Sequence, residues 1–241
     1  SENLTASKSI NINNLPEDFK TRLVEVNAGK MLDYSDGLTQ KVTLNLGDIC
    51  VITGEIGAGK SLFLKLLSNH GSESDISLTI RGEMLAEPKV VKDYFPIYVG
   101  ASTFLIEGPL SENVYLCPSK EINSEQQSKL QQLLEELSLQ HTDLGNYPDL
   151  VEANLSTGNR QIVGILRALM SDHRVVLFDE PTSALDPNLE TRVCSIISKL
   201  DKDKVIFIVT HRDAPIGLAT VRMEIKKPGK FNIWDPRITV Q

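Results

Sequence analysis

A glycine-rich run in the first quarter of the chain has the residue types needed to hold a chain of phosphates. Residues 54–61 read Gly-Glu-Ile-Gly-Ala-Gly-Lys-Ser, which fits the pattern G-x-x-x-x-G-K-[ST]. Glycines let the backbone turn tightly, so that successive N–H groups converge on one anion. Lys60 can reach the β- and γ-phosphates of a nucleotide, and the Ser61 hydroxyl can ligate Mg²⁺. The run therefore predicts a phosphate-binding loop; the plainer alternative is a glycine-rich turn with a solvated lysine.

Two acidic residues end an apolar run in the second half of the chain. Asp179 and Glu180 directly follow the apolar residues 175–178. In hydrolases with such a loop, a carboxylate at the tip of a neighbouring strand holds Mg²⁺ through its water shell, which suits Asp179. Glu180 projects differently and can polarise the attacking water as a general base. Two acids at the end of a strand are common at solvent, so this hypothesis depends on the phosphate-binding loop.

These groups need an α/β scaffold that brings distant segments together. Residues 49–53, before the loop, form a continuous apolar and β-branched run, as expected of a strand covered on both faces. A leucine-rich helical pattern follows from residue 61. Strand-like runs alternate with helical patterns further on, which predicts a P-loop NTPase core with a mainly parallel sheet. The later strand-like runs are 76–80, 95–99, 175–178 and 205–209.

Two further parts are expected around that α/β core. Residues 23–46 contain short β-type stretches separated by turns, which indicates an antiparallel β subdomain. Residues 121–139 carry leucines at helical spacing among Gln, Glu and Lys, which predicts an amphipathic helix in a helical lobe inserted at about 104–160. Residues 1–20 are polar and indicate a tail or linker, which leaves 21–241 as one domain.

Four stretches of the sequence resemble motifs of the ABC ATPases. Residues 155–161, Leu-Ser-Thr-Gly-Asn-Arg-Gln, resemble the LSGGQ signature. Residues 179–186, Asp-Glu-Pro-Thr-Ser-Ala-Leu-Asp, resemble the Walker B motif and D-loop, and residues 209–211, Val-Thr-His, resemble the switch histidine. Residues 34–37, Tyr-Ser-Asp-Gly, resemble the aromatic A-loop. In this order and spacing the motifs cover nearly all of the chain, which is identified as a member of the ABC ATPase family.

The resemblance implies ATP and Mg²⁺ as ligands and ATP hydrolysis as the activity. Asp179 would support the metal ion with Ser61, Glu180 would activate water, and His211 would contact the γ-phosphate. Tyr34 would stack on the adenine, and Lys60 would act in catalysis as well as binding. The residues of the loop that are implied to hold the nucleotide are Gly54, Gly57, Ala58, Gly59, Lys60, Ser61 and Leu62.

The resemblance also implies a face-to-face pair of such domains. Ser156 and Gly158 would close over the γ-phosphate bound to the partner, and Asp186 would lie at the seam. The helix that follows Gly158 would offer N–H groups and a positive dipole to an anion. Plainer roles stay open: Ser156 and Asp186 both suit helix N-caps. Tyr34 also suits an edge strand, and His211 suits an exposed surface.

One position departs from the family pattern. The Q-loop glutamine is expected at residue 101, where this chain has Ala101, and no glutamine lies between Gln40 and Gln126. A methyl group accepts no hydrogen bond from a metal-bound water. Either Ser102 or Thr103 substitutes through water, or metal binding and coupling are weakened.

Composition limits the partners that the chain can take. The formal net charge is −7, with both signs interspersed, which argues against a nucleic-acid partner. Three widely spaced cysteines match no metal-ligand spacing or disulfide framework, so each is expected to pack as a small apolar residue. No signal peptide is recognisable and no apolar run is long enough to span a bilayer, so any membrane part is expected elsewhere.

The leading hypothesis is the ATPase motor of a membrane transporter. It would pair with a second ABC ATPase domain and sit on the cytoplasmic face of a membrane, attached through a transmembrane domain in the same or another chain. The spacing of Gly108, Glu112 and Asn113 resembles the exporter branch of the family. Two alternatives remain: a soluble ABC ATPase that is not coupled to transport, and a low-turnover nucleotide-binding regulatory half, which Ala101 makes plausible.

Overall fold

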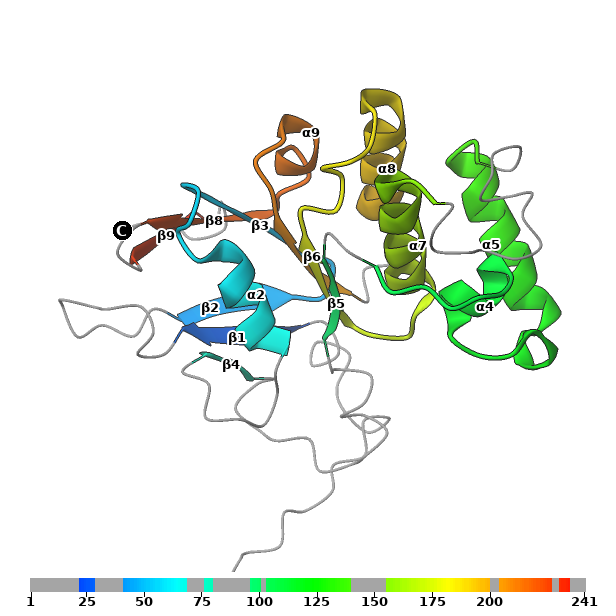
Figure 1. The fold of residues 1–241 in the computed structure, drawn as a ribbon. Coiled ribbons are helices and arrows are strands. Elements are labelled where there is room, and N and C mark those ends of the chain that lie inside the picture. Colours follow the sequence, from blue (N-terminus) through cyan, green and yellow to red (C-terminus); the bar gives the residue numbers. More distant parts are fainter. Residues whose placement is uncertain are drawn as a thin grey trace, which may run out of the picture.

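A six-stranded sheet forms the centre of the molecule (Figure 1). The computed structural model describes residues 22–28, 41–68, 76–79, 96–100, 103–139, 155–199, 204–226 and 230–234. The strand order is β5 (Ile97–Val99), β6 (Val175–Asp179), β7 (Val205–Val209), β3 (Ile49–Gly54), β8 (Val221–Lys226) and β9 (Lys230–Trp234). Neighbouring strands are parallel except for β8 and β9, which are antiparallel. The predicted mainly parallel sheet is confirmed.

Helices cover both faces of this sheet. On β6, Val175 and Leu177 pack in one cluster with helix α2 (Lys60–Ser68). Val176 and Phe178 pack in another cluster with α7 (Thr157–Met170) and α8 (Pro187–Lys199). Side chains along a strand point alternately to its two faces, and here both faces are apolar. The continuous apolar runs of the sequence follow from this double covering.

A second, three-stranded sheet lies on the α2 side. Its order is β2 (Lys41–Asn45), β1 (Arg22–Ala28) and β4 (Ile76–Thr79), and both pairs are antiparallel. Leu44 of β2 is fully buried in the same cluster as α2. The predicted antiparallel β subdomain is confirmed, and Figure 1 shows it at the opposite side of the molecule from α4 and α5.

A group of helices follows β5 in the chain. It contains α4 (Leu110–Tyr115), the 3₁₀ turn η2 (Ser119–Glu121) and α5 (Ser124–Glu136), and α4 packs on α7. Asn123 caps α5, since its side chain accepts from the Gln126 amide while the Gln126 side chain accepts from the Asn123 amide. The predicted amphipathic helix is present, with Leu130 buried. The bounds of 104–160 for an inserted lobe stay a prediction.

The last helix, α9 (Asp213–Ile216), is short and follows β7. None of the helices in the described part of the chain is long and apolar enough to cross a bilayer. Cys50 and Cys194 are buried as expected, whereas Cys117 is half-buried, and none of the three is in a disulfide. The predicted tail 1–20 and the positions of Tyr34 and Ala101 lie outside the described residues.

Candidate functional site

The carboxyl ends of three neighbouring parallel strands, β6, β7 and β3, lie at one edge of the six-stranded sheet. The phosphate-binding loop follows β3, Asp179 ends β6, and His211 comes shortly after β7. Backbone bonds hold these ends together, since the Glu180 amide donates to the Val209 carbonyl at 2.9 Å. Residues from distant parts of the sequence therefore share one edge, which in parallel α/β sheets is the usual place for a ligand.

The phosphate-binding loop has the backbone shape that its glycines predict. Gly57 and Gly59 have φ of 75° and 95°, which L side chains rarely adopt. A side chain on Gly59 would meet no atom within 4 Å, so the loop encloses open space there. The Lys60 ammonium donates to the carbonyls of Gly54 at 2.8 Å and Glu55 at 3.0 Å. Left-handed glycines and the nearby Lys60 ammonium are the features that let a loop bind an anion through its backbone amides.

Asp179 stands where it can support a metal ion. It shares the α2 face of β6 with Leu177, and its Oδ1 accepts from the Ser61 hydroxyl at 3.0 Å. A carboxylate and a hydroxyl are hard oxygen donors of the kind that Mg²⁺ takes together with waters and substrate phosphates. No group of three or more His, Cys, Asp or Glu side chains suited to a metal occurs in the described ranges. These oxygen donors fit a Mg²⁺ ion whose remaining coordination positions would be filled by nucleotide phosphates and water.

Glu180 points away from Asp179 and toward His211. Its backbone is left-handed, with φ of 53°, and its Oε1 lies 2.8 Å from Nδ1 of His211. With the carboxyl ionised, Nδ1 carries the proton and donates to it. The other oxygen, Oε2, is buried and has no hydrogen-bond partner among the residues that the structure describes. A buried acceptor without a partner is suited to take a proton from water.

The signature residues lie at the exposed start of α7. Ser156 caps this helix, because its hydroxyl accepts from the Asn159 amide at 3.1 Å. A Cβ on Gly158 would stand 2.8 Å from the Ala184 carbonyl oxygen. Glycine therefore allows the start of α7 to pack closely against the turn after β6. In the described part of this chain, neither residue is hydrogen-bonded to the phosphate-binding loop. The predicted N-cap role of Ser156 is confirmed, and its role across a dimer seam stays a prediction.

Asp186 is likewise a helix cap. Its Oδ1 accepts from the amides of Asn188 at 3.0 Å and Leu189 at 3.1 Å at the start of α8. The predicted capping role is confirmed. Its carboxylate is exposed, so capping leaves it accessible to another chain.

Gln161, the last residue of the signature run, makes contacts that the sequence did not predict. It is buried on α7, and its amide nitrogen donates to the Glu180 carbonyl at 3.2 Å and to the Ser183 hydroxyl at 2.8 Å. Its amide oxygen accepts from the Ala184 amide at 3.0 Å. In the sequence, Gln161 is an amide side chain next to the apolar residues 162–166, and this position does not identify its hydrogen-bond partners.

A second unforeseen group ties the D-loop to the segment after β7. Arg212 donates to the Thr182 carbonyl at 2.7 Å and to Oε1 of Glu190 at 2.9 Å, and that oxygen also accepts from the Thr182 hydroxyl. Arg212 directly follows His211, so the same contacts fix the backbone on which His211 stands.

Thr103, proposed from the sequence as a substitute for the missing glutamine, faces the other side of the sheet. It is buried, and its hydroxyl lies against Gly164 of α7, where a Cβ on that glycine would collide with it. Asp179 lies on the opposite, α2 face. Thr103 therefore makes no direct contact with the carboxylate of Asp179. The expected A-loop and Q-loop positions, Tyr34 and Ala101, lie outside the described residues.

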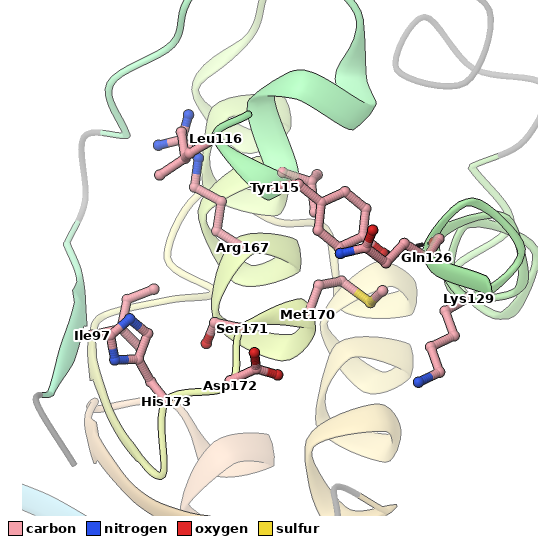
Figure 2. A pocket seen from close by; sticks show the side chains of 11 residues that line it. Ile97, Tyr115, Leu116, Gln126, Lys129, Arg167, Met170, Ser171, Asp172 and His173 are labelled. Carbon is pink, nitrogen blue, oxygen red and sulfur yellow. Dashed lines mark hydrogen bonds between the residues drawn. The ribbon is translucent and has the colours of Figure 1, made fainter. Parts of the chain in front are cut away.

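A separate cleft of about 550 Å³ lies between α4, α5 and the end of α7 (Figure 2). Figure 2 shows Ile97 and His173 at one end of it and Gln126 and Lys129 at the other. Ile97 begins β5, whereas the phosphate-binding loop and Asp179 lie where the strands end. The cleft is therefore distinct from the candidate nucleotide site.

Comparison with known proteins agrees with these features. A family profile described as ABC transporter matches residues 39–183. The putative hemin import ATP-binding protein HrtA of Staphylococcus haemolyticus is 30% identical over 70% of this chain and 78% of its own length. The ATP-dependent lipid A-core flippase of Vibrio parahaemolyticus is 30% identical over 72% of this chain and 30% of its own length.

A solved structure described as an inward-facing conformation of a putative metal-chelate type ABC transporter has the same fold. Its TM-score is 0.63 at 23% identity, over 92% of this chain and 86% of that one. The fold agrees with the profile match, which covers more than half of the sequence. The chain therefore belongs to the ABC transporter family, as one of its ATP-binding domains, which are ATPases.

Proposed function

We propose that this chain binds Mg²⁺ and ATP, pairs around ATP with a second ABC ATPase domain, and uses hydrolysis to drive a membrane transporter. The observation that carries the proposal is the pair of carboxylates at the end of β6. Asp179 is bonded to Ser61 of the phosphate-binding loop, while Glu180 is bonded to His211 and keeps one buried oxygen without a partner. Together they would provide metal support and a general base beside the phosphate-binding loop.

Hydrolysis follows from what these side chains can hold and accept. The loop amides and Lys60 would bind the β- and γ-phosphates and lower the cost of the charge that develops on them. Oε2 of Glu180 would take a proton from the attacking water as its oxygen bonds to the γ-phosphorus and the bond to ADP breaks. His211, bonded to Oε1, would keep the carboxylate in that orientation. Mg²⁺, when bound, would neutralise charge on the β- and γ-phosphates.

The distribution of exposed apolar side chains supports two partners. In the described part of the chain, the large apolar residues most open to solvent form two groups. Ile56 and Leu62, which are 93% and 47% exposed, belong to the phosphate-binding loop and the start of α2. Phe104 and Leu116, which are 69% and 59% exposed, lie before and at the end of α4 in the chain. Exposed apolar side chains often mark binding surfaces. The first group suits the second ABC domain, and the second suits a transmembrane partner at the cytoplasmic face of a membrane.

The direction of transport has no support beyond the sequence. The exporter expectation rested on the spacing of Gly108, Glu112 and Asn113. Among the similar proteins, the names that state a direction are those of import ATP-binding proteins and one flippase, so they give export no support. Export therefore stays a prediction.

Steady-state phosphate release from Mg²⁺-ATP tests the proposed activity. We expect Glu180→Gln to lower the rate about 100-fold or more while ATP binding is kept, because general-base catalysis is typically worth a factor of this size. The matched control is Glu121→Gln, an exposed glutamate on η2, which should leave the rate unchanged.

An unchanged rate in the Glu180→Gln variant would remove Glu180 from the role of base. A wild-type chain that binds ATP but releases phosphate no faster than a protein-free control would overturn the motor proposal. It would favour the low-turnover regulatory half instead.

A further inference from the structure

The carboxylate of Asp179 is held from two sides. Ser61 donates to its Oδ1 at 3.0 Å, and the Tyr98 hydroxyl donates to its Oδ2 at 2.8 Å. Asp179 itself is 8% exposed, so water competes little for these oxygens. A carboxylate with a donor on each oxygen has a fixed rotation about its last side-chain bond.

The position of Tyr98 follows from the pairing of two strands. Tyr98 is the middle residue of β5 and lies opposite Leu177 of β6 in parallel register. Its ring packs against the cluster on the α2 face of the sheet, which is the face that Asp179 shares. A tyrosine is long enough to reach from there to the end of the neighbouring strand, where the carboxylate lies.

Gly100 leaves the room that this ring occupies. A Cβ at position 100 would stand 2.9 Å from Cε1 of Tyr98 and 3.2 Å from its hydroxyl oxygen. Real Cβ atoms are essentially never as close as 2.9 Å, so any other residue at position 100 would push the end of the ring aside. The position of the Tyr98 hydroxyl therefore depends on glycine at position 100.

The hydroxyl of Tyr98 remains a donor at neutral pH. A phenol ordinarily loses its proton only at about pH 10, so the group is protonated there. Ala101, three residues later, brings no side-chain donor or acceptor, and Thr103 faces α7. Tyr98 therefore gives β5 a polar contact with the carboxylate at the metal end of the site.

We propose that Tyr98 is a positioning residue for the metal site: its hydroxyl aims the Asp179 carboxylate, and Gly100 keeps that hydroxyl in place. The inference rests on the proposed function, in which Asp179 and Ser61 hold Mg²⁺. Groups that orient a metal-supporting carboxylate set metal affinity without touching the metal. Their loss typically weakens metal binding by about 10- to 100-fold.

The test is a Mg²⁺ titration of the binding of a fluorescent, non-hydrolysable ATP analogue, which does not depend on turnover. For Tyr98→Phe we expect the half-saturating Mg²⁺ concentration to rise about tenfold, with little change in analogue affinity at saturating Mg²⁺. The matched control is Tyr115→Phe. Its hydroxyl is also half-buried and donates at 2.7 Å to a carbonyl, that of Gln126, but beside the separate cleft. Thermal unfolding of both variants checks that each is folded.

Gly100→Ala gives an independent check on the same arrangement. Alone, it should raise the Mg²⁺ requirement, because the ring end must shift. Combined with Tyr98→Phe, it should add little, because the hydroxyl that it displaces is already gone.

The outcomes separate the two proposals. If the wild-type chain shows no Mg²⁺-dependent analogue binding, the proposed function fails. If the wild-type chain binds normally and Tyr98→Phe matches Tyr115→Phe in Mg²⁺ requirement, the positioning role of Tyr98 is overturned while the proposed function stands.

Discussion

At the scale of single residues, the side chains of Asp179 and Glu180 have different hydrogen-bond partners because β6 ends between them. Asp179 keeps the alternation of β6 and faces α2, whereas Glu180 turns into a left-handed backbone with φ of 53°. Such a conformation costs a residue other than glycine about 1–3 kcal/mol. Bonds from its own amide to Val209 and from Gln161 to its carbonyl offset part of that cost. In the proposed function, this strained turn would direct the Asp179 carboxylate to the metal ion and the Glu180 carboxylate to the attacking water.

Ala101 is the residue at which the sequence departs from the family pattern. We expect Ala101→Gln to raise the hydrolysis rate or the Mg²⁺ affinity, on the order of tenfold, because an amide oxygen can accept a hydrogen bond from metal-bound water. Phosphate release measured across a Mg²⁺ series checks this. Ser102→Gln is the matched control, since it places the same side chain one position later. No response to Ala101→Gln would mean that the loop has adapted in another way.

At the scale of elements, Gln161 connects the signature helix to the catalytic strand. One buried side chain on α7 bonds to the Glu180 carbonyl and to two residues of the turn after β6. Gly158 lets the same helix approach that turn closely. A movement at the start of α7, where we propose that a second domain binds, would therefore reach the backbone of Glu180, the proposed general base.

We expect Gln161→Leu to lower kcat about tenfold with little change in the KM for ATP, because Glu180 loses a contact that fixes its carbonyl. Stability should fall by about 1–3 kcal/mol, since buried groups lose their hydrogen-bond partners. Steady-state kinetics and urea unfolding measure the two effects, with the exposed Gln127→Leu on α5 as control. A kcat that falls only in proportion to the unfolded fraction would reduce Gln161 to a packing role.

The sequence predicted elements better than it predicted contacts between them. Runs such as 175–178 and 205–209 are apolar throughout because both faces of the sheet are covered, so their type and place were predictable. The phosphate-binding loop and the two carboxylates were found because their spacing is itself the signal. Tyr98 and Gln161 were not found, because their partners are set by strand register and by helix packing between residues far apart in the chain.

At the scale of the whole molecule, the groups needed for hydrolysis and the groups expected to seal the site lie on different parts of one chain. Lys60, Asp179 and Glu180 gather at the edge of the sheet, whereas Ser156 lies at the exposed start of α7. In the described part of the chain, no hydrogen bond joins Ser156 to the loop. In the proposed function, a single chain would supply half of each of two sites, and ATP would complete each site by joining two domains.

The mass of the Glu180→Gln variant in solution, with and without saturating Mg²⁺-ATP, tests this central claim most directly. We expect a monomer without nucleotide and a dimer with it, because ATP that is not hydrolysed would hold the two domains together. Adding Ser156→Arg to that variant should abolish the dimer while ATP still binds, whereas Ser128→Arg on α5 should not. A variant that binds ATP and stays monomeric at saturation would contradict the account.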